Sequence, residues 1–282
     1  QVLWHKLFDY MLKLEPRTFH KAVTSHNIPL WKEANKSEID SILQNHTWEL
    51  VDLTPGSKAL GSKWIFRRKM KADGSIDKYK ARLVIKGYRQ REGLDYFDTY
   101  SPVTRITSIR MVIAITTLRG LEIHQMDVKT DFFNGDLDEE IYMEQPEGFL
   151  APGKKNKVCK LFKSLYCLKQ APKQWHEKFD NVMLSNRLRI NEYDQCIYVK
   201  DTNRGYVILC LYVDDILIVG SNDEMVQTTK RLLNSKFDMK DMGLADVILG
   251  IEITRTSSGI VLSQSHYVEQ ILEKLSKSDT SV

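Results

Sequence analysis

The chain has 282 residues, of which 42% are hydrophobic and 28% charged, and its formal net charge at pH 7 is +4. This composition is typical of a globular chain long enough for two or three subdomains, and it excludes an intrinsically disordered protein. No apolar run approaches the roughly 20 residues that cross a bilayer, and no basic-then-apolar leader opens the sequence. We therefore expect an intracellular protein of the cytoplasm or nucleus that is neither secreted nor bound to a membrane.

The first part of the chain predicts a helix followed by a hairpin. Residues 1–30 carry mixed signals and are taken as an N-terminal extension. An apolar stripe predicts a helix over Trp31–Leu43. Strand-like arms at Trp64–Phe66 and Tyr79–Ile85 flank Ala72–Ser75, whose Asp-Gly pair is a good signal for a hairpin turn.

This hairpin is strongly basic. Between Lys63 and Arg91 the chain carries eleven Lys or Arg residues against two Asp, a net charge of +9, which leaves −5 for the remainder. A basic element attached to an acidic body favours a localised surface that binds a polyanion. On charge alone, a solvated hairpin without a ligand remains the alternative.

The middle of the chain predicts two helices with a strand and a loop between them. Thr107 is expected to cap a helix through Leu118 that is apolar on most sides and therefore deeply buried. A strand is expected over Leu121–Val128 and an acidic loop over Asp136–Glu147. After residue 172 an amphipathic helix is expected, whose apolar face carries Trp175, Phe179, Val182 and Met183.

Two hairpins and two further helices are expected after residue 200. Val207–Leu211 and Ile216–Val219 are apolar runs rich in β-branched residues, typical of buried strands joined by a tight turn. Ser221–Glu224 matches a capping box and predicts a helix through Leu233. A second hairpin is expected around residues 257–259, and a helix over Tyr267–Leu275 closes the chain. Strands interleaved with helices predict an α+β fold with an antiparallel core.

The turn of the first of these hairpins carries two adjacent carboxylates, Asp214 and Asp215. Their charges repel and burial disfavours the ionised form, so we expect a hard divalent metal to compensate them. A solvated Asp-Asp turn would be the alternative if the motif stood alone. Asp127, at the end of its own strand, would complete a two-metal site that activates a 3′-hydroxyl and clamps a triphosphate. Lys80 and Arg82 on the hairpin's return arm would supply cations for the triphosphate and the template backbone.

Other sites of known sequence pattern are missing from the chain. There is no GxGxxG after a strand, no GxxxxGK[ST], no HExxH and no GxSxG, and the seven histidines are scattered. The cysteines form no CxxC pair and no zinc-spaced cluster, and we expect reduced thiols at Cys159, Cys167, Cys196 and Cys210.

Several ordered motifs identify a family. The chain strongly resembles the reverse transcriptase domain of Ty1/copia-type LTR retrotransposon Pol polyproteins, particularly plant elements, over nearly all of 29–275. The motifs are Trp48-Glu49-Leu50-Val51, Lys80-Ala81-Arg82-Leu83-Val84, Tyr100-Ser101-Pro102-Val103, the segment at Asp127, Leu168-Lys169-Gln170-Ala171-Pro172 and Tyr212-Val213-Asp214-Asp215. The resemblance implies a right-hand polymerase of fingers, palm with an antiparallel sheet, and thumb. It also implies an RNA-directed DNA polymerase that uses two Mg²⁺ (or Mn²⁺) ions, a primer on an RNA or DNA template, and dNTPs.

The resemblance also assigns residues. It implies that Asp127, Asp214 and Asp215 are catalytic and, with Val128, bind metal. The nucleotide-binding residues would be Lys80, Arg82, Phe132 and Gln170, with Phe132 stacking under the sugar and excluding a 2′-hydroxyl. Contacts to primer and template would come from Lys169, Ala171, Pro172, Tyr212, Leu249 and Gly250, the last two in a primer-gripping hairpin.

Three departures from the family pattern suggest an impaired copy. Asp131 replaces a small apolar residue beside the expected nucleotide pocket, where its charge would repel a triphosphate. Cys167 replaces a glycine that would allow close backbone approach to the nucleotide. Around Asn186-Arg187-Leu188 the family's Gly-Phe pair is missing. We also expect a fragment or genomic relic, because the ribonuclease H and integrase portions of the polyprotein are not in this sequence.

The resemblance sets the expected domain bounds and leaves three hypotheses. The bounds are 1–30 N-terminal extension, 31–103 fingers with the basic hairpin, 104–133 first part of the palm, 134–166 fingers insertion, 167–263 second part of the palm, and 264–282 start of a truncated thumb. The first hypothesis is a polymerase core, either fully active or impaired. The second is a catalytically dead nucleic-acid-binding protein of the same fold, and the third is an inert remnant. Asp131 and Cys167 favour the last two, whereas the intact carboxylates favour the first.

Overall fold

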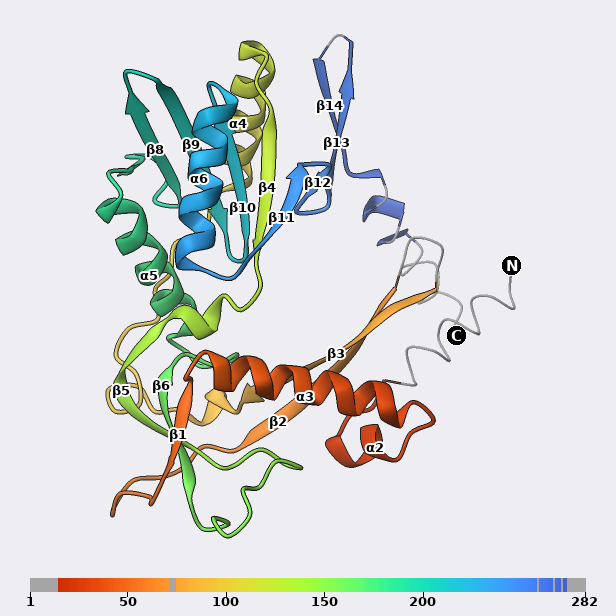
Figure 1. Cartoon of the computed structure of the whole chain (residues 1–282), viewed down its shortest axis with the longest axis vertical. Coiled ribbons are helices and arrows are strands. Elements are labelled where there is room, and N and C mark those ends of the chain that lie inside the picture. The colour runs from red at the N-terminus through yellow and green to blue at the C-terminus, as the bar shows by residue number, and fades with distance from the viewer. Residues whose placement is uncertain (1–14, 71–74, 258, 266, 270, 273–282) are drawn as a thin grey trace. The chain divides into compact units, whose positions relative to one another are not determined.

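The computed structural model describes residues 15–70, 75–257, 259–265, 267–269 and 271–272 (Figure 1). The chain separates into two compact units. Unit 1 comprises Gln1–Ser101 and Thr130–Asp180, and unit 2 comprises Pro102–Lys129 and Asn181–Val282. Both units mix helices with antiparallel strands, which confirms the predicted α+β class. The unit bounds and the expected subdomain bounds differ at 102–103, 130–133 and 167–180. The naming of the units as fingers and palm stays a prediction.

The described residues of unit 1 form two small sheets and one long helix. The helices are α2 (Phe19–Val23), α3 (Ile28–Gln44), the short 3₁₀ helices η1 (Gly87–Arg89) and η2 (Phe132–Asn134), and the first part of α5 (Ala171–Ser185). One sheet has the order β1-β6-β5, with β1 (Trp48–Val51), β6 (Val158–Lys163) and β5 (Asp136–Met143). The other is the predicted basic hairpin of β2 (Ser62–Met70) and β3 (Ile76–Ile85).

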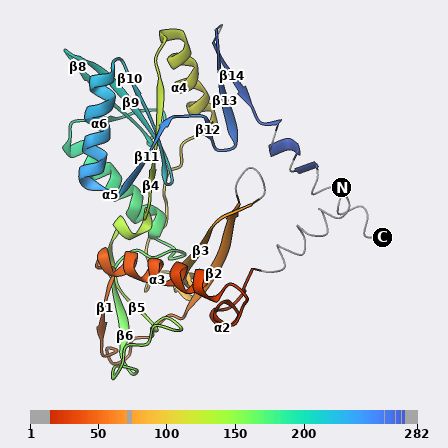
Figure 2. The same ribbon diagram turned by 45° about the vertical axis from the view of Figure 1, so that its right-hand side comes forward.

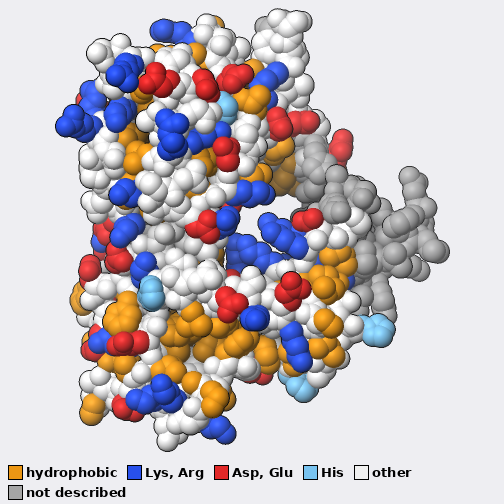
Figure 3. Space-filling view, in the orientation of Figure 1, with side chains coloured by type: hydrophobic (Ala, Val, Ile, Leu, Met, Phe, Trp, Pro, Cys, Tyr) orange, Lys and Arg blue, Asp and Glu red, His pale blue; other side chains and the backbone are white. Residues whose placement is uncertain are grey.

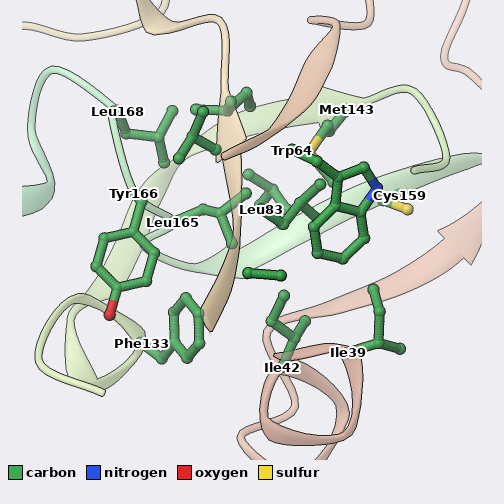
Figure 4. Packing of buried hydrophobic residues seen from close by; sticks show 14 of the residues in the cluster. Ile39, Ile42, Trp64, Leu83, Phe133, Met143, Cys159, Leu165, Tyr166 and Leu168 are labelled. Atoms are coloured by element: carbon green, nitrogen blue, oxygen red, sulfur yellow. The ribbon is translucent and has the colours of Figure 1, made fainter. Parts of the chain in front are cut away.

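The core of unit 1 forms between α3 and both sheets. Trp31 of α3 packs edge-on against Phe66 and Tyr79 of the hairpin, with ring centroids 5.3 and 4.6 Å away. Figure 4 shows how Ile39 and Ile42 from the same helix face Trp64 and Leu83. The hairpin therefore has one buried apolar face, whereas Lys80 and Arg82 alternate with these core residues along β3.

Unit 2 is a six-stranded antiparallel sheet in the order β11-β4-β10-β9-β8-β7. Its strands are β4 (Ile123–Val128), β7 (Arg189–Ile190), β8 (Ile197–Thr202), β9 (Gly205–Tyr212), β10 (Asp215–Gly220) and β11 (Met239–Leu244). The helices α4 (Ile106–Arg119) and α6 (Asp223–Lys236) cover opposite faces, as two views of the ribbon show (Figures 1 and 2). A further three-stranded sheet joins β12 (Val247–Ile248), β13 (Ile251–Thr256) and β14 (Gly259–Ser263).

Most predicted elements are confirmed. The helix over 31–43 extends to α3, the amphipathic helix after residue 172 is α5, and both predicted late hairpins are present. The turn at 72–75 lies largely outside the described residues, and so does part of the closing helix over 267–275. None of the helices in the described part of the chain is both long and apolar enough to cross a membrane.

Three local predictions are wrong. The helix α4 begins at Ile106 after Arg105, which makes no side-chain cap, so Thr107 is not the cap. That helix is also not deeply buried on most sides, because Met111 and Leu118 are 64% and 85% exposed. The expected acidic loop forms β5 instead, since its apolar end pairs with β6.

The start of α6 also differs from the expected capping box. Asn222 is the cap and accepts a hydrogen bond from the Met225 amide at 3.0 Å. The Ser221 hydroxyl instead accepts from the Tyr206 amide at 3.0 Å, which ties the end of β10 to β9. Ser221, which the local sequence predicts as the cap, therefore bonds to another strand and does not cap the helix.

Candidate active site

Two of the three predicted catalytic carboxylates lie on neighbouring strands of unit 2. In the antiparallel pairing of β10 with β4, Asp215 stands directly opposite Asp127. Residues directly opposite each other project from the same face of a sheet, with Cβ atoms about 5 Å apart. Asp214 adjoins them, because its backbone carbonyl accepts a hydrogen bond from the Val128 amide at 2.8 Å.

The Asp-Asp turn is a strained two-residue hairpin. Tyr212 pairs with Asp215, so Val213 and Asp214 alone make the turn. Val213 has φ of +56°, a left-handed conformation that a β-branched residue rarely adopts. It costs roughly 1–2 kcal/mol, and backbone strain of this kind is concentrated at functional sites. This turn sets the position of Asp214 next to the paired residues Tyr212 and Asp215.

The surroundings of Asp215 disfavour its ionised form. Partial burial raises the pKa of its carboxyl above the ordinary value, and the nearby charges of Asp214 and Asp127 raise it further. The Gln125 side chain opposes this shift, because its Nε2 donates to Asp215 Oδ1 at 2.8 Å and favours the ionised form. Sequence reasoning missed Gln125, although it lies two residues before Asp127 and therefore on the same face of β4.

A bound divalent cation would relieve this repulsion, so the donor set fits Mg²⁺ or Mn²⁺. Among the described residues, no three or more His, Cys, Asp or Glu side chains are already gathered as a metal site. The two-ion site therefore stays a prediction that rests on the register and the charges.

A second residue that sequence reasoning missed lies on the other side of Asp127. Lys240 of β11 is directly opposite Asp127, so Lys240, Asp127, Asp215 and Tyr212 form one row across four strands. Lys240 is exposed and brings a positive charge to the edge of the carboxylate pair. No local pattern marks this lysine, because its place depends on the pairing of β11 with β4.

The predicted primer-gripping residues also occupy a two-residue turn in unit 2. Ile248 pairs with Ile251, and Leu249 and Gly250 between them have φ of +53° and +73°. Two positive φ values in succession are typical of the tight hairpin turns that favour glycine. The turn is a defined structure, and its contact with a primer stays a prediction.

The predicted nucleotide-binding cations lie on β3 of unit 1. Lys80 and Arg82 share one face of the hairpin, opposite Arg67 and Ile65, and Lys and Arg side chains gather along this region in the space-filling view (Figure 3). Both side chains are half-buried. Burial and the neighbouring charge of Arg82 lower the pKa of Lys80. The pair is therefore closely spaced and partly desolvated, which strengthens its attraction for a phosphate.

Glu38 of α3 lies beside these cations. Its Oε1 accepts a hydrogen bond from the Leu83 amide on the outer edge of β3 at 3.1 Å. Burial raises the pKa of Glu38 to about 7, although Lys80 and Arg82 both lower it. This carboxyl therefore titrates near neutral pH next to the predicted phosphate-binding strand.

Asp131 is buried, only 5% exposed, and its Oδ1 accepts a hydrogen bond from the Tyr166 hydroxyl at 3.3 Å. Phe132 follows it in η2, with its ring edge-on to Tyr166 at 5.3 Å. Tyr166 in turn lies under Arg82, whose guanidinium carbon is 4.8 Å from the ring centroid. The structure thus joins three residues of the predicted pocket through Tyr166, which sequence reasoning did not select.

Gln170 is fully buried within unit 1. Its Nε2 donates to Glu139 Oε2 at 3.1 Å and to the Asp95 carbonyl at 3.2 Å, and its Oε1 accepts from Gln90 at 3.0 Å. The amide therefore holds the segment together, and a direct contact with a nucleotide stays a prediction. Beside it Lys169 and Pro172 are exposed, whereas Ala171 is buried.

Two residues that replace expected glycines have a left-handed backbone conformation. Cys167 has φ of +73° and Arg187 has φ of +64°, both in the left-handed region that favours glycine. Arg187 follows the end of α5, where the Leu188 amide bonds to the Met183 carbonyl at 3.1 Å in the pattern of a glycine-type helix end. The Cys167 side chain is exposed. Its backbone carbonyl lies so close to Gly87 that a Cβ atom added to Gly87 would be 1.8 Å from the carbonyl oxygen.

Comparison with known proteins identifies the family. The family described as "Reverse transcriptase (RNA-dependent DNA polymerase)" matches residues 45–281. The chain is 45% identical over 263 residues to the "Retrovirus-related Pol polyprotein from transposon TNT 1-94" of Nicotiana tabacum, and 41% identical over 261 residues to that from transposon RE1 of Arabidopsis thaliana. Each alignment covers 92% of this chain but only 20% and 18% of the relatives, so the chain spans about a fifth of their length.

A solved structure also matches, a foamy viral protease-reverse transcriptase in complex with double-stranded DNA. The TM-score is 0.40 at 13% identity, and the match covers 84% of this chain and 36% of that one. The family match extends over most of the chain and includes all three aspartates of the site. The chain therefore belongs to the reverse transcriptase (RNA-dependent DNA polymerase) family and is similar to that part of copia-type retrotransposon Pol polyproteins.

Proposed function

We propose that this chain is an RNA-directed DNA polymerase core that extends a primer on an RNA or DNA template with dNTPs. One observation carries the proposal: Asp127 and Asp215 are register partners on adjacent strands, with Asp214 tied to Val128 beside them. The proposed setting is a Pol polyprotein that also contains ribonuclease H and integrase portions, acting in the cytoplasm or nucleus.

The residues would share the work as follows. Asp127, Asp214 and Asp215 would hold two Mg²⁺ ions, which supply Lewis-acid activation of the primer 3′-hydroxyl and stabilise the leaving pyrophosphate. Gln125 would keep the Asp215 carboxylate ionised and oriented, since it donates to Oδ1 at 2.8 Å. No separate protein base is required in such a site.

Unit 1 would supply the nucleotide-binding side chains. Lys80 and Arg82 would neutralise the triphosphate, and Phe132 would lie under the sugar and exclude a 2′-hydroxyl. Lys169, Ala171 and Pro172 of unit 1, with Tyr212, Leu249 and Gly250 of unit 2, would contact primer and template. Because phosphate contacts carry little sequence information, binding should be salt-sensitive and nearly independent of sequence.

A catalytically dead nucleic-acid-binding protein of the same fold is the second candidate. Cys167 favours it, because a left-handed backbone beside the predicted template-contacting segment carries a side chain where glycine is preferred. Such a protein would keep the basic hairpin and bind nucleic acid without extending a primer.

Primer extension separates the two candidates. The unmodified chain, Asp127→Asn and Asp214→Asn are compared on an RNA template with Mg²⁺, and binding of primer–template is measured by fluorescence anisotropy. Polymerase function requires extension by the unmodified chain and a loss of at least about a hundredfold in both variants. Asp201→Asn, an exposed aspartate in β8 of the same sheet, is the matched control and should leave the rate unchanged. Tight binding without extension would select the second candidate.

A further inference from the structure

Tyr166 occupies the centre of a buried cluster in unit 1. Tyr166 is 9% exposed, and Figure 4 shows its ring beside Phe133. Phe132 and Phe133 both meet the ring edge-on with centroids 5.3 Å away. Arg82 lies over the ring face at 4.8 Å, and Asp131 accepts from the hydroxyl at 3.3 Å. One aromatic ring thus contacts a cation, a carboxylate and two phenylalanines.

The charges around the ring reinforce one another. Burial and the neighbouring Asp131 carboxylate raise the pKa of Tyr166 well above its usual range, so the phenol stays protonated and donates to Asp131. A carboxylate that accepts from the hydroxyl polarises the phenol and makes the ring face more negative, which strengthens its attraction for a guanidinium. Arg82 Nε is buried and has no hydrogen-bond partner among the described residues. The guanidinium is therefore held by its contact with the Tyr166 ring face and not by a hydrogen bond from Nε.

The backbone holds this arrangement in place from two directions. The Tyr166 carbonyl accepts a hydrogen bond from the Ile85 amide at 3.1 Å, which joins the segment to the outer edge of β3. Two residues earlier on the same edge, the Leu83 amide is bound by Glu38. The backbone of Tyr166 is therefore held against the strand that carries Arg82. The hydrogen bond from its hydroxyl to Asp131 fixes the orientation of the side chain.

We propose that Tyr166 is a positioning residue for nucleotide binding, which orients Arg82 toward the triphosphate and Phe132 toward the sugar, with Asp131 as its anchor. This inference rests on the proposed function of Arg82 and Phe132. It assigns Asp131 a supporting role in place of the damaging repulsion expected from its charge, because the carboxylate is buried and engaged by a neutral donor.

The test uses the full chain and three variants of the cluster. Tyr166→Phe removes only the hydroxyl, Asp131→Ala removes the anchor, and Asp131→Asn retains a carbonyl acceptor for the same hydrogen bond. Primer extension with varied dNTP gives KM and kcat separately. An independent readout is the Nε–Hε signal of Arg82 in NMR spectra of arginine-labelled protein, identified by its loss in Arg82→Lys.

Tyr142 offers a matched control inside the same unit. It is 3% exposed, and Lys160 lies 6.0 Å over its ring. Its hydroxyl donates to Glu140 at 2.6 Å and forms a second hydrogen bond with the Thr54 hydroxyl. The variant Tyr142→Phe therefore also removes a tyrosine hydrogen bond to a carboxylate, together with the bond to Thr54, and does so at a ring that contacts neither Arg82 nor Phe132 in the described aromatic and cation–π contacts. Thermal unfolding of every variant reports whether it folds.

The expected result is a threefold to tenfold rise in the dNTP KM for Tyr166→Phe and Asp131→Ala, with kcat within twofold and the Arg82 signal moved. A binding contact that is equal in the ground and transition states changes KM in this way. Asp131→Asn should recover most of the KM, and Tyr142→Phe should change neither KM nor the Arg82 signal.

Two outcomes overturn the inference. One is an unmoved Arg82 signal in Tyr166→Phe together with an unchanged KM. The other is a lower dNTP KM in Asp131→Ala, which would mean that the carboxylate repels the triphosphate. If the unmodified chain extends no primer at all, the proposed function fails separately, and the Arg82 signal in Tyr166→Phe alone decides the positioning role.

Discussion

Asp215 of β10 lies directly opposite Asp127 of β4, although 88 positions separate them in the sequence numbering. The pairing brings two like charges to one face of the sheet, where burial and mutual repulsion raise the pKa of Asp215. In the proposed metal site Asp215 would act in its ionised form, and both effects make that form less favourable. The hydrogen bond from Gln125 opposes this rise in the pKa of Asp215.

The first prediction concerns that hydrogen bond. Replacing Gln125 by Leu removes a donor that favours the ionised carboxylate, so the pKa of Asp215 should rise further. In the proposed mechanism activity requires the ionised form of Asp215 and is lost as pH falls through its pKa. The acid limb of the profile of kcat/KM against pH should therefore move to higher pH. An acid limb at the same pH in both proteins would show that Gln125 does not tune this group.

The second prediction concerns Glu38, whose pKa is raised to about 7 by burial. A carboxyl whose pKa is higher in the folded than in the unfolded state destabilises the fold above its folded pKa, and that penalty disappears as pH falls toward the unfolded value. Unit 1 should therefore lose on the order of 2–3 kcal/mol of unfolding free energy between about pH 5 and pH 8.

Glu38→Gln is the matched variant for this prediction, because its carbonyl can still accept from Leu83. Its unfolding free energy should be nearly constant over the same pH range. Urea unfolding followed by tryptophan fluorescence reports on unit 1, which contains Trp31, Trp48, Trp64 and Trp175. Parallel pH dependences for the two proteins would contradict a neutral-range titration of Glu38.

The third prediction separates a phosphate grip from a diffuse basic surface. Changing Lys80 and Arg82 together to Gln should raise the dNTP KM more than the same change at Arg67 and Arg68. The second pair is a suitable control because it lies on the partner strand of the same hairpin, with Arg67 70% exposed and paired to Glu15. Equal effects of the two pairs, each lost at high salt, would indicate a diffuse surface instead.

The fourth prediction concerns the two left-handed positions. Cys167→Gly and Arg187→Gly should each stabilise the fold by about 1 kcal/mol, because glycine adopts positive φ without the Cβ clash. Cys167→Ala and Arg187→Ala keep the Cβ and should not stabilise it. Chemical denaturation of the four variants gives the comparison. Equal stabilities of the Gly and Ala variants would mean that backbone strain at these sites is negligible.

Local pattern was sufficient for elements whose signal is their own periodicity. The apolar runs around residues 207–219 specify two buried strands wherever they pair, and the stripe of Trp175, Phe179 and Met183 specifies one face of a helix. It failed where a tertiary partner competes for a residue. Ser221 bonds to Tyr206 instead of capping α6, and residues 136–143 pair with β6 instead of forming a loop.

The sequence by itself determined the α+β class, the family and the three aspartates, because each depends on residues close together in the chain or on an ordered set of motifs. Only the tertiary structure decided which side chains meet across strands: Gln125 with Asp215, Lys240 opposite Asp127, and Tyr166 between Arg82 and Asp131. Strand order and register set those contacts, and they follow from the packing of the whole unit. No local pattern contains that information.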